Sequence, residues 1–168
     1  MLTIWGRPTS ARTQKVLWAL AETGIEFEMI LASGTMGPNG SVDKGNEPYG
    51  VVDTTEYLAM NPNGTVPTIK DGDFTLWESN SVIQYLAMKY APEPLFGDDL
   101  ETFASASRWM DWEGNMFLPH QHTLVMHLVR LPPEERDPAQ VEGARQALLR
   151  PLKIIDSQLA KTSFISGE

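Results

Sequence analysis

The sequence predicts an α/β N-terminal domain with a small mixed four-stranded sheet, followed by an all-helical domain. Two observations lead to this prediction. Over residues 1–90 the expected elements follow the order β-α-β-loop-β-β-α, and after residue 98 the strand signals end. A helical crossover allows the first two strands to be parallel, whereas a tight turn makes the last two antiparallel.

The first three elements are short and clearly bounded. Residues 2–6 are apolar and β-prone, and a Gly-Arg-Pro turn ends them. A helix is expected over residues 11–23, because apolar residues recur at helical spacing and Gly24 follows at the position of a left-handed C-cap. Residues 25–31 alternate as a strand does.

The remaining strands form a hairpin. Residues 32–50 are rich in Gly, Ser, Asn and Pro without periodicity, which predicts a long surface loop. One helical turn is expected over residues 55–60. A strand over residues 66–70, the turn Lys70-Asp71-Gly72-Asp73 and a partner strand over residues 74–77 complete the sheet.

A helix over residues 79–90 closes the first domain. Ser79 is expected to be its N-cap, and Pro92 prevents its continuation. Two prolines and a glycine in residues 91–98 predict a linker. The domains are therefore expected at residues 1–90 and 99–168.

The second domain contains only helical patterns. A capping box beginning at Asp98 precedes a long helix over residues 101–128, expected to bend at Pro119. Asp137-Pro138 predicts the start of an amphipathic helix, which Pro151 is expected to kink or restart.

Composition excludes several classes of function. The net charge of −9 argues against nucleic-acid binding and against a polybasic membrane patch. No apolar stretch is long enough to predict a membrane span, and cysteine is absent, so no thiolate site or cysteine nucleophile is expected. His120 and His127 are spaced to share a helical face, but no acidic partner completes a ligand set, so no metal is expected.

Ser10 is the first candidate site residue. It lies between the first strand and the first helix, where free N–H groups and the positive end of the helix dipole gather. A thiol bound there would be favoured as its thiolate, and this thiol need not belong to the protein. Thr9 is the alternative hydroxyl, and a simple N-cap is the alternative role.

Two further candidates follow in the hairpin region. Pro67 cannot donate to a sheet ladder, so the backbone of Val66 is exposed; an ordinary edge-strand proline is the alternative. Ser79 can offer its hydroxyl and N–H to a carboxylate, while Glu78 accepts from an ammonium group. Together they fit the head of an α-amino acid, with a plain cap beside a surface acid as the alternative.

Four segments together resemble one known family: WGRPTSARTQKVLWAL, EYLAMNPNGTVPTIKDGDF, LWESNSVIQYLA and RWMDWEGNMF. Over nearly its whole length the chain resembles the cytosolic glutathione S-transferases, in their bacterial serine-type (theta-, nu- or beta-like) forms. The resemblance implies a thioredoxin-like N-terminal domain and an all-α C-terminal domain. It also implies an enzyme that activates the glutathione thiol for attack on a small hydrophobic electrophile.

The resemblance also implies roles for single residues. Ser10 would donate to the glutathione thiolate, and Val66 would pair with the cysteinyl backbone beside a cis Pro67. Glu78 and Ser79 would hold the γ-glutamyl end.

Two further groups of residues complete the expected site. The protein and glutathione are both negatively charged. The positive charge of Arg12, near Ser10, would help to offset the repulsion between them. The resemblance places an electrophile pocket beside the helix over residues 101–128, where Trp112, Met116 and His120 would line it. A place in the helical core is the alternative for each of these three residues.

The resemblance finally implies a cytoplasmic homodimer that uses glutathione as co-substrate and no metal. The helical domain of the family continues beyond FISGE, so we expect this domain to be incomplete. The alternative functions are a non-catalytic binding or scaffold protein, and a glutathione-dependent reductase or peroxidase that uses no protein cysteine.

Overall fold

The chain divides into two units, Met1–Phe96 and Gly97–Glu168, in the computed structural model. The structure describes residues 1–33, 51–91, 95 and 99–167. Most of the expected loop 32–50 and of the expected linker 91–98 lies outside the described residues, as does Asp98.

The first unit contains the predicted mixed sheet and three helices. The helices are α1 (Ala11–Thr23), α2 (Thr55–Met60) and α3 (Ser79–Tyr90), and the strands are β1 (Leu2–Gly6), β2 (Phe27–Leu31), β3 (Thr68–Asp71) and β4 (Phe74–Trp77). The sheet order is β2-β1-β3-β4, with β1 parallel to β2 and the other pairs antiparallel. The predicted thioredoxin-like arrangement is confirmed.

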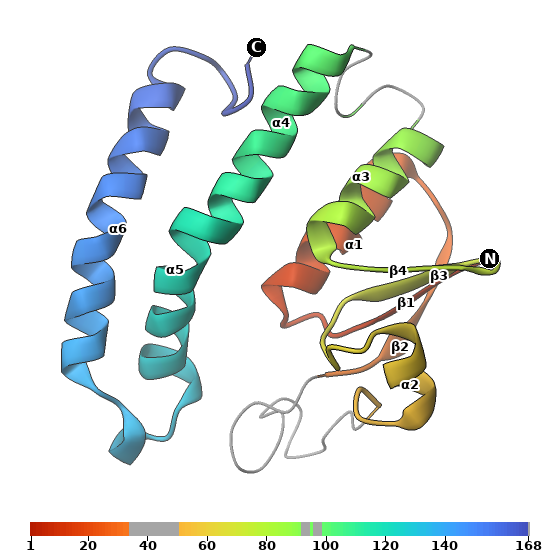
Figure 1. Cartoon of the computed structure of the whole chain (residues 1–168), viewed down its shortest axis with the longest axis horizontal. Helices are drawn as coiled ribbons and strands as arrows, with labels where there is room; N and C mark the ends of the chain where they lie inside the picture. Colours follow the sequence, from red (N-terminus) through yellow and green to blue (C-terminus); the bar gives the residue numbers. More distant parts are fainter. Residues whose placement is uncertain (34–50, 92–94, 96–98, 168) are drawn as a thin grey trace. The chain divides into compact units, whose positions relative to one another are not determined.

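Helices cover both faces of this sheet: α1 and α3 lie on one face and α2 on the other (Figure 1). Successive side chains of β1 point to opposite faces of the sheet, so each face has its own core. Leu2 and Ile4 are buried in the core that includes residues of α1 and α3. Trp5 points the opposite way and packs in the second core around Tyr57 of α2. The bounds predicted for α1, α2 and α3 are confirmed.

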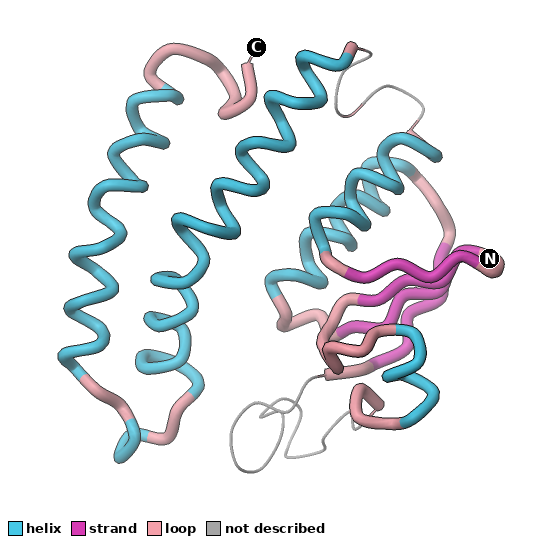
Figure 2. Tube along the Cα trace, in the orientation of Figure 1, coloured by secondary structure: helices cyan, strands magenta, loops and turns pink. Residues whose placement is uncertain are grey.

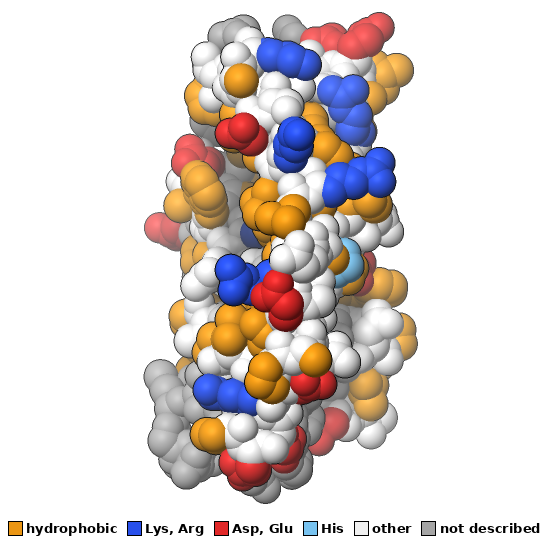
Figure 3. Space-filling model, turned by 90° about the vertical axis from the view of Figure 1, so that its left-hand side faces the viewer, with side chains coloured by type: hydrophobic (Ala, Val, Ile, Leu, Met, Phe, Trp, Pro, Cys, Tyr) orange, Lys and Arg blue, Asp and Glu red, His pale blue; other side chains and the backbone are white. Residues whose placement is uncertain are grey.

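Two long helical segments form the second unit. The first combines α4 (Leu100–Trp112), the π-helix η1 (Glu113–Phe117), α5 (Leu118–Val125) and the π-helix η2 (Met126–Arg130). After the short η3 (Pro133–Glu135), α6 (Pro138–Leu159) returns alongside them (Figure 2). Ala144 and Leu148 of α6 are buried, whereas Leu149 and Leu152 are exposed. Figure 3, which shows the left-hand side of Figure 1, has hydrophobic side chains interspersed with Lys and Arg side chains on its surface.

The structure corrects two expected helix caps. Ser79 is the first residue of α3, and Glu78 occupies the N-cap position. The box predicted to begin at Asp98 is wrong, because Asp99 caps α4: its carboxylate accepts from both the N–H and the hydroxyl of Thr102. Asp98 and Asp99 are adjacent in the sequence, and the N-cap is whichever of them directly precedes the first helical residue. A sequence pattern locates that residue only to within one or two positions.

The two prolines expected to disturb helices of the second unit lie in different local geometries. Pro119 lacks an N–H, and the irregularity lies just before it, where the Leu118 N–H donates five residues back to the Glu113 carbonyl. Helix α6 passes through Pro151 without restarting, because the helix is long on both sides and Pro151 is buried. The third strand begins at Thr68 rather than at residue 66.

A polar cluster ties the hairpin to the end of α3. The Asp71 carboxylate accepts hydrogen bonds from Lys89 at 2.8 Å and from the hydroxyls of Tyr85 and Tyr90, each at 2.6 Å. These bonds, with that from Lys89 the largest cause, lower the pKa of Asp71 to about 2 from its ordinary 3.8. The Asp71 carboxylate therefore stabilises the folded state only while it is ionised.

We expect Asp71→Asn to lower the free energy of unfolding by about 1–3 kcal/mol at neutral pH, because the donors lose a charged acceptor. A lowered pKa in the folded state adds stability above pH about 4, and that stability is lost as the pH falls toward about 2. Urea unfolding between neutral and acid pH measures both effects. Asp73→Asn, in the same turn, is the control. An equal loss in both variants, or an unchanged acid dependence in Asp71→Asn, contradicts the prediction.

Candidate functional site

Three chain segments meet at one edge of the sheet in the first unit. In the ladders Trp5 pairs with Thr68, and Thr68 pairs with Trp77. The chain that leaves β1, the chain that enters β3 and the chain that leaves β4 therefore lie side by side (Figure 2). These segments contain Thr9-Ser10, Val66-Pro67 and Glu78-Ser79, so six of the predicted site residues share this edge.

Ser10 caps α1 and keeps its proton available. Its Oγ accepts a hydrogen bond from the Thr13 N–H at 3.3 Å, and its backbone is extended, as an N-cap requires. A hydroxyl has one donor and two acceptor positions, so the cap leaves the O–H free to donate to a ligand. The two roles considered for Ser10 are thus compatible, and the side chain is only half-buried.

Close packing fixes where α1 begins. A Cβ at Gly6 would lie 2.6 Å from the Thr13 Cγ2, so only glycine allows the first turn of α1 to approach the end of β1 this closely. The Ser10 N–H donates to the Arg7 carbonyl at 3.1 Å and completes the turn. These contacts hold the start of α1, with Ser10, at the sheet edge.

The electrostatics at the start of α1 favour an anion despite the acidic composition. No acidic residue occupies the first turn of α1, so no side chain there neutralises the positive end of the helix dipole. Arg12 lies in that turn, half-buried, and Arg7 is 5% exposed just before it. Thr9 is exposed beside Ser10.

The peptide bond between Val66 and Pro67 is cis, as the resemblance implied. Val66 is half-buried and Pro67 is buried. Neither residue belongs to β3, so the backbone of Val66 stands outside the ladder that begins at Thr68.

Glu78 has a strained backbone, with φ of +71° and ψ of 110°. A non-glycine residue in this region costs about 1–3 kcal/mol and persists where the surroundings or the function require it. Its side chain is exposed and makes no capping bond to α3 in the described part of the chain. The first N–H groups of α3, beginning at the buried Ser79, therefore face the edge without a side-chain cap.

Sequence reasoning missed a buried polar cluster beneath Val66. Tyr57, Asn61 and Thr68 are at most 1% exposed, and their side chains bond to one another and to the Thr65 carbonyl. The four-residue spacing of Tyr57 and Asn61, one turn of a short helix, was the available signal.

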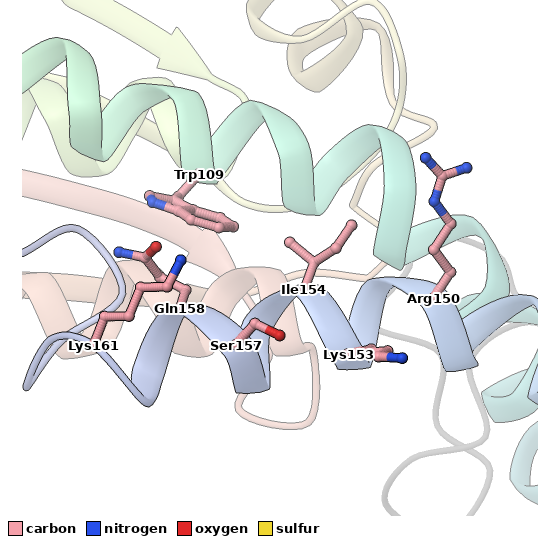
Figure 4. A pocket seen from close by; sticks show the side chains of 7 residues that line it. All are labelled: Trp109, Arg150, Lys153, Ile154, Ser157, Gln158 and Lys161. Carbon is pink, nitrogen blue, oxygen red and sulfur yellow. The ribbon is translucent and has the colours of Figure 1, made fainter.

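The second unit holds an open pocket of about 320 Å³. Trp109 reaches from α4 toward Ile154 and Gln158 of α6 (Figure 4), and the pocket is further lined by Arg150, Lys153, Ser157 and Lys161. None of the three residues predicted to contact the electrophile lines it. Those residues follow one helical segment: Trp112 in α4, Met116 in η1 and His120 in α5.

The described residues include no group of three His, Cys, Asp or Glu side chains that is arranged to hold a metal ion. His127 accepts at Nδ1 a hydrogen bond from the Asp137 N–H at 3.0 Å, which joins η2 to the start of α6. Within the described chain, every helix is too short or too polar to cross a membrane.

Comparisons with known proteins find similar chains over the whole length of this one. Residues 9–89 match the family described as "Glutathione S-transferase, N-terminal domain". Glutathione S-transferase GstB of Escherichia coli (strain K12) is 39% identical over 171 residues, which cover 100% of this chain and 76% of that relative. Glutathione S-transferase 3 of Zea mays is 31% identical, over 99% of this chain and 71% of that relative.

Solved structures extend the likeness to both units. The theta class glutathione S-transferase of Xanthomonas axonopodis pv. citri, crystallised with glutathione bound, aligns with a TM-score of 0.86 and 37% identity. The alignment covers 99% of this chain and 73% of that one. Poplar glutathione transferase F1 aligns with a TM-score of 0.81 and 30% identity, over 99% of this chain and 73% of that one.

Proposed function

The chain belongs to the glutathione S-transferase family, and from this premise we propose that it binds glutathione at the sheet edge where the ends of β1 and β4 meet the start of β3. The observation that supports this location is the meeting of three segments there, each with one kind of group that the tripeptide needs. They offer a hydroxyl donor, an exposed backbone, and an acid beside a helix N-terminus.

The Ser10 hydroxyl is proposed to hold the sulfur as a thiolate. An O–H donor and the positive end of α1 both stabilise negative charge, which lowers the pKa of a bound thiol below the ~8.5 of a free one. The thiol proton leaves to solvent. The thiolate then bonds to an electrophilic carbon as the leaving group departs with its electron pair.

The other residues are proposed to orient the tripeptide. The backbone of Val66, beside Pro67, aligns the cysteinyl part as an added strand would. Glu78 accepts from the γ-glutamyl ammonium, and Ser79, at the start of α3, receives the carboxylate. Arg12 offsets part of the charge on the ligand.

Further proposals concern the whole protein. We propose that the electrophile is small and hydrophobic and contacts Trp112, Met116 and His120, and that the first unit is the glutathione-binding domain. We also propose that the protein works as a homodimer in the cytoplasm, as the family resemblance implies. Light scattering at known concentration tests the dimer.

Calorimetric titration with glutathione, followed by a conjugation assay with an activated aryl halide, tests the function. We expect heat from saturable binding and turnover that depends on both substrates. Binding without turnover favours the scaffold alternative. Peroxide or disulfide reduction without conjugation favours the reductase or peroxidase alternative. No binding heat at millimolar glutathione contradicts the proposed site.

A further inference from the structure

A closed set of hydrogen bonds lies beneath the segment that leads into Val66. The Tyr57 hydroxyl donates to the Thr65 carbonyl at 2.7 Å and lies 2.8 Å from the Thr68 Oγ1. The Asn61 Nδ2 donates to the same carbonyl at 2.9 Å and to the Thr68 Oγ1 at 3.1 Å. The carbonyl of Thr65 therefore accepts from two buried side chains on α2 and its C-cap.

Counting protons fixes the directions of these bonds. Tyr57 has one hydroxyl proton, and the Thr65 carbonyl can only accept it, so the Thr68 hydroxyl donates to the Tyr57 oxygen. Thr68 then accepts from Asn61, whose two amide protons are both used. The Asn61 Oδ1 accepts from the N–H and the Nδ2 of Asn63, at 3.1 and 3.0 Å. Every polar group of Tyr57, Asn61 and the Thr68 side chain is thus paired.

Burial makes this arrangement rigid. The side chains of Tyr57, Asn61 and Thr68 are excluded from water, so no solvent molecule can replace a lost partner. Desolvation is the largest effect on the pKa of the Tyr57 hydroxyl and raises it, so the hydroxyl keeps its proton and remains a donor at working pH.

Because a peptide group is planar, the direction of the Thr65 carbonyl also fixes the direction of the Val66 N–H. The Thr65 carbonyl and the Val66 N–H belong to one peptide group, which is trans, because the cis bond described here follows Val66. In a trans peptide the C=O and N–H point in opposite directions. A carbonyl held inward by Tyr57 and Asn61 therefore directs the Val66 N–H outward, away from the cluster.

We propose that Tyr57, Asn61 and Thr68 are positioning residues that aim the Val66 N–H at the cysteinyl backbone of glutathione. This inference rests on the proposed function, because it assumes that Val66 meets the ligand. The cluster acts on binding. It does not act on the thiolate, whose proposed donor is Ser10 on another segment.

Tyr57→Phe tests the proposal, because it removes one hydroxyl and keeps the ring. We expect the dissociation constant for glutathione, measured by calorimetry, to rise about tenfold, the usual effect of misaligning one ligand hydrogen bond. We expect kcat at saturating glutathione, and the apparent pKa of the bound thiol, to stay near the wild-type values. A role in stability alone would not produce this split between binding and turnover.

Tyr85→Phe is the matched control. It also removes a hydroxyl that donates from the first unit, but to Asp71 at the other end of β3. We expect this variant to lose stability and to keep the wild-type affinity for glutathione. Thr68→Val, with Thr68→Ser as its conservative partner, repeats the test on a second member of the cluster in case Tyr57→Phe does not fold. Affinity is expected to fall in the valine variant and to return with serine.

The outcomes separate this inference from the proposed function. If wild-type protein binds no glutathione, both are wrong. If wild-type protein binds and Tyr57→Phe binds equally well, or if Tyr57→Phe and Tyr85→Phe weaken binding equally, only the positioning role is overturned.

Discussion

Ser10→Ala is expected to lower turnover about 10- to 100-fold while leaving the affinity for glutathione nearly unchanged. The thiolate loses its hydroxyl donor, whereas the backbone and head-group contacts proposed for the tripeptide remain. This loss corresponds to about 1.4–2.7 kcal/mol of transition-state stabilisation. We also expect the apparent pKa of the bound thiol to rise, so the loss of rate is largest near neutral pH and shrinks in alkali.

The structure shows why this experiment needs controls. Ser10 also caps α1 through the Thr13 N–H, and losing a cap costs about 0.5–2 kcal/mol of stability. Ser10→Thr keeps both the hydroxyl and the cap and should retain most turnover. Asp137→Ala removes a cap of the same kind from α6, where the Asp137 carboxylate accepts from the Ala139 N–H, and should leave the thiol pKa unchanged.

The measurements are steady-state kinetics across pH and ultraviolet titration of the bound thiolate. If Ser10→Ala turns over at the wild-type rate, Ser10 is not the thiolate donor, and the neighbouring Thr9 becomes the candidate. If Asp137→Ala loses turnover to the same extent, the effect belongs to helix stability.

Glu78→Gln is expected to weaken glutathione binding about 10- to 100-fold. The proposed bond from the γ-glutamyl ammonium to the Glu78 carboxylate is charge-assisted, and such bonds contribute about 1.5–3 kcal/mol. Glutamine has nearly the same shape and leaves the strained backbone in place. The change therefore removes the charge with little effect on the geometry of the turn into α3.

A shortened ligand isolates this contact. Cysteinylglycine lacks the γ-glutamyl group, so wild type and Glu78→Gln should bind it equally weakly. Asp73→Asn removes the same charge at the other end of β4 and should bind glutathione as the wild type does. Calorimetry or inhibition kinetics measures all five affinities. An equal weakening of both ligands by Glu78→Gln contradicts the assignment of Glu78 to the ammonium group.

The strained backbone at Glu78 offers a further comparison. Glycine adopts positive φ without a steric penalty, so Glu78→Gly should relieve the strain of this turn. We expect this variant to be at least as stable as Glu78→Gln and to bind glutathione no better. A gain in stability with a loss of binding would indicate that glutamate is kept at this strained position because its side chain is needed for binding.

Features that depend on a few neighbouring residues were predictable. The apolar spacing within α1, the hydroxyl at Ser10 and the glycine at Gly24 together bound that helix, because capping and periodicity act within a turn or two. The hairpin turn at Gly72 was predictable for the same reason, because it too depends on neighbouring residues. The order of strands and helices then restricted the fold to a small mixed sheet with helices on its faces.

Other features require contacts between distant segments. The φ of Glu78 and its place at the N-cap result from the way β4 must turn into α3, which no single residue type signals. The cluster of Tyr57 with Thr68 joins residues eleven positions apart, and both are polar residues that a sequence pattern assigns to a surface.

The sequence by itself determined the elements, the absence of a protein thiol and the groups that a thiol ligand would need, because these depend on residue type and short-range spacing. Only the tertiary structure decided that Ser10, Val66 and Glu78 share one edge, since strand register brings them together. It alone placed Tyr57 beneath Val66, because buried polar groups must find partners wherever the fold supplies them.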